Sequence, residues 1–107
     1  MSKYPIPADS TIEEVMLKLK SASGPVTKNL YSSNGFQVIV LGLNAGELFP
    51  DHVTKVPAKL TVLEGSVVYQ DADTSVPLFC YDEIDIPVDK VHSVLANRRS
   101  ICLLIRG

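Results

Sequence analysis

The 107-residue chain has no surplus of positive charge. Ten Lys plus Arg stand against twelve Asp plus Glu, which gives a formal net charge of -2 and a pI near 5.6. Nucleic acids are bound largely through basic side chains that neutralise their phosphates. We therefore expect no nucleic-acid partner.

Long apolar runs are also missing. The longest covers residues 38–43 and so has six residues, whereas a helix that spans a bilayer needs about 20. The first seven residues show no apolar core of the kind found in a secretory signal. On this basis we expect a cytoplasmic protein with no membrane partner.

Reactive side chains are few. The two cysteines, Cys80 and Cys102, lie in apolar, strand-like stretches. They could form a disulfide, but we favour two buried free thiols that pack as small hydrophobic side chains. No glycine-rich phosphate loop and no Ser-His-Asp arrangement stands out. The sequence settings of the only two histidines, His52 and His92, are therefore the most informative about function.

The chain does contain enough apolar sequence for one core. Hydrophobic residues make up 46% of it, and its length indicates a single domain. Ser10 and Glu13 have the spacing of a capping box, which predicts a helix start. Gly24 and Pro25 predict its end. Between them, apolar residues with helical spacing predict a face that packs on the main body: Ile12, Val15, Met16 and Leu19.

After Pro25, turn signals divide the chain into short apolar segments. Asn34 and Gly35 form the strongest of these signals, a two-residue hairpin turn. No helical pattern follows, which predicts an all-β antiparallel sandwich or barrel of eight or nine strands. The predicted strands cover residues 26–31, 36–43, 58–64, 66–70, 76–80, 83–86, 91–96 and 100–105.

The surroundings of His52 have the spacing of the first motif of the cupin superfamily, G-x5-H-x-H-x3/4-E-x6-G. In that register the chain has Gly46, five residues, His52, one residue, Thr54, three residues, Ala58, six residues and Gly65. The two glycines and His52 match the motif. Thr54 stands where cupins have a second histidine, and Ala58 stands where they have a glutamate.

The surroundings of His92 resemble the second cupin motif, G-x5-P-x-G-x2-H-x3-N. Here the chain has Tyr81, five residues, Pro87, one residue, Asp89, two residues, His92, three residues and Ala96. Pro87 and His92 match. Tyr81 and Asp89 replace glycines, and Ala96 replaces the asparagine. The resemblance covers residues 36–105.

This resemblance implies a double-stranded β-helix, also called a jelly roll. Residues 26–107 would form the cupin β-barrel, and residues 1–25 an N-terminal extended segment and helix, within one domain. The alternation of side chains along a strand agrees with this, because an inward His52 predicts an inward Thr54. If the same phase continues, Ala58 also points inward, followed by Leu60 and Val62.

Cupins generally hold a transition metal with three histidines and a glutamate. This chain supplies only His52 and His92 from matching positions, because the Thr54 hydroxyl is a poor ligand and Ala58 has no donor atom. Two imidazoles can bind zinc or copper if another donor joins them. No spacing places any of the candidate donors beside both histidines: Glu47, Asp51, Tyr69 and Cys80.

Three functions follow as hypotheses. The leading one is a binding protein without a cofactor, whose barrel cavity, marked by His52, Thr54, Ala58 and His92, takes a small organic molecule. The second is a metal-dependent oxygenase or isomerase that uses zinc, iron, nickel or copper on His52 and His92. The third is a stability or interaction module with no ligand.

A homodimer is the expected oligomer. Residues 36–43 are apolar on both strand faces, so both need cover from a second sheet, a helix or a partner chain. The resemblance points the same way, because cupins commonly dimerise. Residues 3–7 are a candidate segment for reaching across to a partner.

Overall fold

The computed structural model describes residues 10–107, and its helix begins where the sequence predicts. Helix α1 (Thr11–Leu19) is preceded by Ser10, whose hydroxyl accepts a hydrogen bond from Glu13 N at 3.0 Å. Ser10 N donates in return to the Glu13 carboxylate at 3.3 Å. The capping box is thus confirmed. The helix ends at Leu19, before Gly24 and Pro25, so these two residues lead into the first strand instead.

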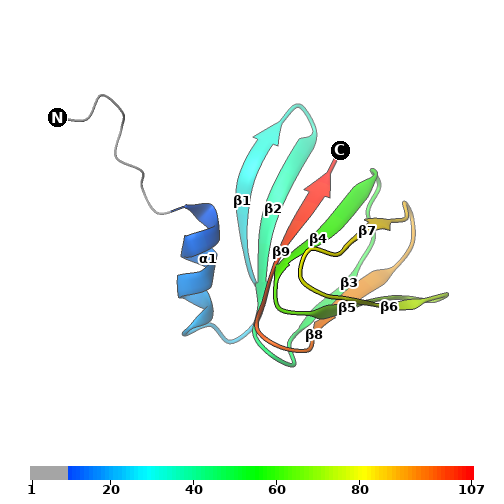
Figure 1. The fold of residues 1–107 in the computed structure, drawn as a ribbon. Coiled ribbons are helices and arrows are strands. Elements are labelled where there is room, and N and C mark those ends of the chain that lie inside the picture. The colour runs from blue at the N-terminus through cyan, green and yellow to red at the C-terminus, as the bar shows by residue number, and fades with distance from the viewer. Residues whose placement is uncertain (1–9) are drawn as a thin grey trace.

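Nine strands within residues 10–107 form two antiparallel sheets (Figure 1). The first sheet has the order β1-β2-β9-β4-β7, and the second has the order β3-β8-β5-β6. This arrangement confirms the predicted all-β fold class with one short helix. The strands are β1 (Val26–Ser33), β2 (Phe36–Leu43), β3 (Leu48–His52), β4 (Ala58–Glu64), β5 (Val67–Asp71), β6 (Ser75–Leu78), β7 (Glu83–Ile86), β8 (His92–Ala96) and β9 (Ser100–Arg106).

The hairpin between β1 and β2 turns at the predicted residues. Asn34 has a φ of 46° and Gly35 a φ of 83°, the two positive values that a tight hairpin turn requires.

No helix among residues 10–107 is long and apolar enough to cross a membrane.

The sequence analysis did not predict strand β3 and therefore did not assign His52 to its strand. The sequence analysis continued the alternation of His52 and Thr54 into the strand that ends at Glu64, but His52 is the last residue of β3 in the other sheet. Residues 53–57 connect the two sheets. The signal was weak because Pro50 lies within β3, and the pairing of β3 with β8 shifts register between Phe49 and His52.

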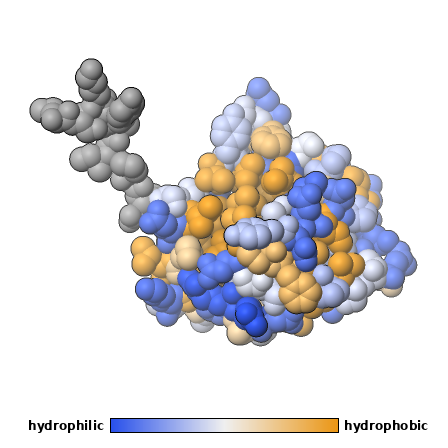
Figure 2. All heavy atoms as spheres, viewed as in Figure 1, coloured by the Kyte–Doolittle hydropathy of each residue, from blue (hydrophilic) through white to orange (hydrophobic). Residues whose placement is uncertain are grey.

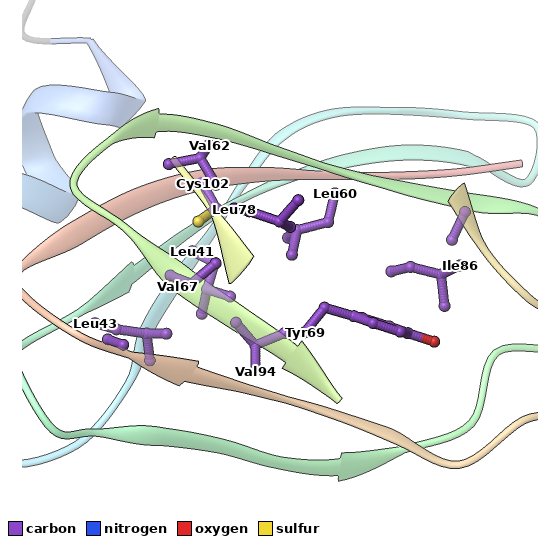
Figure 3. Packing of buried hydrophobic residues seen from close by; sticks show 12 residues of the cluster. Leu41, Leu43, Leu60, Val62, Val67, Tyr69, Leu78, Ile86, Val94 and Cys102 are labelled. Atoms are coloured by element: carbon purple, nitrogen blue, oxygen red, sulfur yellow. The ribbon is translucent and has the colours of Figure 1, made fainter. Parts of the chain in front are cut away.

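The core lies between the two sheets (Figure 3). On the first sheet, Leu41, Cys102 and Val62 are paired across β2, β9 and β4 and are all buried. Side chains from the second sheet pack against this row: Val67, Tyr69, Leu78, Val94 and Ala96. Large side chains therefore fill the interior around this row.

The prediction of two buried thiols is right for Cys102 and wrong for Cys80. Both cysteines are free, but Cys80 is exposed in the turn after β6, where its thiol donates to Leu63 O at 3.1 Å. Burial raises the pKa of the Cys102 thiol to about 12. The apolar residues before Cys80 suggested burial, but the strand ends at Leu78, before the cysteine is reached.

The outer face of the first sheet is covered at one end by α1. Val15 and Leu19 of the helix pack on Val40 and Ile101. Gly42 permits this close approach, because a Cβ at that position would lie 2.6 Å from Val15 Cγ1. Strand β2 is therefore covered on its inner face by the second sheet and on part of its outer face by the helix, as its two apolar faces predict.

Gly65 is the glycine whose replacement should cost most. It has a φ of 87°, and an added Cβ would lie 2.3 Å from Arg99 O and 2.4 Å from Ser100 Oγ. Gly65→Ala should lower the free energy of unfolding by about 2–5 kcal/mol, since left-handed strain and a backbone clash add. Urea denaturation measures this change.

Gly46→Ala is the matched control, because Gly46 has a φ of 82° and nothing within 4 Å of an added Cβ. Gly46→Ala introduces the left-handed strain without a clash, so it should lower the free energy of unfolding by only about 1–2 kcal/mol. Equal losses in the two variants would contradict the close contact at Gly65.

Candidate ligand cavity

A cavity of about 350 Å³ lies between the sheets, beyond the filled part of the core. His52, Thr54, Ala58 and His92 all line it, so the structure brings together the four residues that the sequence analysis singled out. The alternation argument for Thr54 started from the wrong strand, but the connection after β3 still places Thr54 at the cavity, where it is 5% exposed.

The two histidines face each other across one strand pair. His52 ends β3 and His92 begins β8, and the two are paired in the ladder, with ring centroids 6.3 Å apart. The His52 ring stacks on Phe49 at 4.2 Å and the His92 ring on Tyr69 at 5.8 Å. His52 is exposed and His92 is 6% exposed. One imidazole therefore lies at the mouth of the cavity and the other inside.

Both imidazoles are held by backbone carbonyls. His52 Nδ1 contacts Pro50 O, and His92 Nδ1 lies 3.1 Å from Lys90 O. A carbonyl oxygen only accepts hydrogen bonds, so Nδ1 must carry the proton in each ring. Nε2 is then the nitrogen left for a ligand, which is also the arrangement common in metal-binding histidines.

The connection after β3 is tied to the turn before β8. Asp89 N donates to Thr54 O at 2.9 Å, so the backbones that carry Thr54 and His92 are held close together. The Thr54 hydroxyl donates to Val56 O at 2.7 Å and accepts from Val56 N at 3.3 Å. Because the hydroxyl is used within its own turn, Thr54 acts here as part of the wall.

Two residues that replace motif glycines still have glycine-like backbones. Tyr81 has a φ of 73° and Asp89 a φ of 61°, the left-handed conformation that non-glycine residues rarely adopt. The matched glycines, Gly46 and Gly65, are left-handed as well. All four positions thus have the backbone that the motif register requires, although two of them carry side chains.

The residues around the histidines do not fit the usual cupin metal set. Within the described part of the chain, no group of three or more His, Cys, Asp or Glu side chains could hold a metal. The side chain of Asp51 lies outside that part. The other candidate donors are engaged elsewhere: Glu47 with Asn44 N at 2.7 Å, Tyr69 with Asp71 at 2.8 Å, and Cys80 with Leu63 O.

The ring of Tyr69 packs against the ring of His92. The tyrosine is 1% exposed, and its hydroxyl donates to Asp71 Oδ2. Burial raises the pKa of Tyr69 above its ordinary value, and the bond to Asp71 adds to this. The same hydrogen bond lowers the pKa of Asp71, whose other oxygen accepts from the backbone in the turn after β5. The ring that His92 stacks on is thus fixed at both ends.

Among the lining residues that the sequence analysis did not single out are Arg106 and Phe49. Arg106 is the last residue of β9, and the predicted strand stopped one residue short of it. The alternation of Cys102 and Leu104 along that strand would have placed Arg106 on the inner face. Phe49 belongs to β3, which was not predicted, so no sequence signal pointed to it.

Comparison with solved structures identifies the fold. A cupin superfamily protein from Desulfitobacterium hafniense is 19% identical, with coverage of 99% of this chain and 92% of that chain and a TM-score of 0.74. An RmlC-like cupin from Desulfovibrio desulfuricans is 17% identical, covers 99% and 96%, and has a TM-score of 0.69. A cupin-2 domain protein from Shewanella frigidimarina is 15% identical, covers 91% and 94%, and has a TM-score of 0.71.

The chain therefore has the cupin fold. Its sequence matches no family model and no curated protein. The low identities to the solved structures speak for the fold alone, and the function has to be argued from the cavity.

The double change Thr54→His and Ala58→Glu tests whether these positions surround a cupin metal site. If both side chains enter the cavity beside His52 and His92, zinc or nickel affinity should rise roughly a hundredfold or more over the parent. The melting temperature should then rise with added metal. Calorimetric titration of both proteins measures the gain.

Removing His52 from the double variant (His52→Ala) is the control and should abolish that gain. Glutamate in place of a buried alanine costs about 1–3 kcal/mol before metal binds, so circular dichroism must first show that the variant is folded. A folded variant that binds metal no better than the parent would contradict the site assignment.

Proposed function

We propose that the protein binds a small organic molecule in the cavity between its sheets, without the metal chemistry usual for cupins. The supporting observation is that the interior is hollow at the four motif positions, two of which carry no metal ligand. Ala58, which stands where the motif has a glutamate, is too small to fill the cavity that it lines. The cavity persists beside the imidazoles.

The lining suits an apolar ligand with few polar groups. Ile39, Phe49, Ile86 and Leu104 contribute apolar walls from both sheets, and five polar side chains complete the described lining: Thr27, His52, Thr54, His92 and Arg106. The volume is near the lower end of the roughly 300–1,000 Å³ typical of ligand pockets. It corresponds to about ten water molecules in the liquid. A single-ring compound or a short chain fits this description.

The orientation of the histidines favours a second candidate, a metal-dependent oxygenase or isomerase. Both Nδ1 atoms are held by carbonyls, which leaves both Nε2 atoms for a cation. Zinc, iron, nickel or copper would need a further donor that the described side chains do not supply. Metal analysis of untagged protein separates the candidates, because stoichiometric metal that is lost in His52→Ala would favour the enzyme.

Neutral fragments provide the test of cavity binding. On addition of benzamide and other single-ring compounds, amide NMR signals of Thr54, Ala58 and His92 should shift with saturation. Ala58→Phe fills the cavity, so it should abolish these shifts or weaken the affinity at least about tenfold, by loss of about 1.4 kcal/mol or more of binding free energy.

Ala72→Phe is the matched control, because Ala72 is exposed in the turn between β5 and β6. This variant should bind the fragments as the parent does. If neither neutral nor acidic fragments shift a cavity signal in the parent, the proposal is overturned. Shifts that survive Ala58→Phe would place the binding elsewhere.

We further propose that two copies of the chain pair through the outer face of the first sheet. Beyond α1 this face carries an apolar patch, with Tyr31 at 56% and Phe36 at 42% exposure beside the half-buried Val38 and Ile105. Figure 2 shows hydrophobic side chains gathered over β2 and β9. A contiguous apolar patch of this kind favours association, and the same patch on two copies can meet around a two-fold axis.

Sedimentation equilibrium should give twice the 11.6 kDa chain mass. Val38→Glu places a charge in the patch and should produce monomers. Val91→Glu is the control, because Val91 is 52% exposed next to the second sheet, so this variant should remain dimeric. A parent mass of one chain at micromolar concentration would refute the dimer. Residues 3–7, expected to reach across, lie outside the described residues.

A further inference from the structure

Arg106 brings a positive charge to the cavity that the motif positions do not account for. It ends β9, where its ladder partners are Gln37 on β2 and Ala58 on β4. It is in phase with Cys102, which is buried in the core, and with Leu104, which also lines the cavity. The strand therefore directs Arg106 inward, and the side chain is half-buried.

Arg106 differs from the other half-buried cationic side chains of residues 10–107 because it has no described carboxylate partner. Each of the others has one: Lys28 with Glu14, Lys59 with Glu83 and Asp85, Lys90 with Asp73, and Arg99 with Glu64. A guanidinium that is partly removed from water gains most from an anion.

The cavity offers no described acidic group to meet this charge. Its polar lining consists of two histidines, two threonines and Arg106, and no described Asp or Glu side chain lines it. In the cupin motif a glutamate would stand at position 58, directly across the ladder from Arg106. With Ala58 in that place, the space beside the guanidinium is open.

We propose that the ligand is a small organic acid, whose carboxylate pairs with the Arg106 guanidinium while its apolar body lies against Ile39, Phe49 and Leu104. This proposal rests on the proposed function, since it names the ligand class of the same cavity. A guanidinium binds a carboxylate through two parallel hydrogen bonds. One arginine balances the single charge of a carboxylate better than the charge of roughly -2 on a phosphate monoester.

Matched acids and amides test the inference. Benzoate and benzamide have nearly the same shape and differ in charge, as do hexanoate and hexanamide. In titrations of the parent followed by NMR, each acid should bind at least about tenfold more tightly than its amide. Addition of benzoate should also shift the Arg106 Nε–Hε signal. Phenyl phosphate should bind more weakly than benzoate.

Arg106→Gln should bind acids and amides equally, near the amide affinity of the parent. Arg106→Lys retains the charge but not the two-pronged geometry, so the preference should shrink without vanishing. Arg106→Lys also tests the role of Arg106 if Arg106→Gln fails to fold. Arg98→Gln removes an equal charge from an exposed position before β9 and should leave the preference unchanged.

The two proposals fail in different ways. If amides bind as tightly as their acids, or if the preference for acids survives Arg106→Gln, the inference is wrong while binding in the cavity stands. If neither acids nor amides shift the signals of Thr54, Ala58 and His92, the proposed function itself is wrong. Tighter binding of phenyl phosphate than of benzoate would overturn the assignment of a carboxylate.

Discussion

The site depends on the register in which β9 is held between β2 and β4. That register sets Leu41, Cys102 and Val62 in one inward row, and it pairs Arg106 with Ala58 two rows further on. Side chains from the second sheet pack against Leu41, Cys102 and Val62 and fill the interior there. Ala58 and Arg106 instead combine the smallest apolar side chain with a charged one. A slip of one residue would turn every inward side chain outward. The cavity is thus a consequence of strand pairing.

Strong periodicity in the sequence was enough to predict the main elements. The bounds of β2 match residues 36–43 because turn signals border the apolar run on both sides, and the capping box at Ser10 fixed the start of α1. Prediction failed where the local signal and the tertiary contacts disagree. Strand β3 contains Pro50 and an irregular register, so only its pairing with β8 makes it a strand. Cys80 looks buried in sequence and lies in an exposed turn.

The motif spacing predicted more about the backbone than about the chemistry. Left-handed conformations occur at Tyr81 and Asp89, where the motif has glycine, because the turns before β7 and β8 need that geometry whatever residue occupies them. The hydrogen bond from Asp89 N to Thr54 O depends on one of these turns. The geometry of the turns before β7 and β8 does not depend on the side chains at Thr54 and Ala58, because the Thr54 hydroxyl bonds only within the connection after β3. A fold can therefore retain the motif spacing after its metal ligands have changed.

The charge of the cavity follows from the same substitutions. A glutamate at position 58 would bring a negative charge to the cavity opposite Arg106. Alanine removes that negative charge and leaves the guanidinium without a described partner. Phe49, Tyr69 and two backbone carbonyls contact the imidazoles and hold them in place. A cavity lined by a guanidinium and by no described carboxylate is the basis of the proposed preference for acids, and its walls are set by strand pairing.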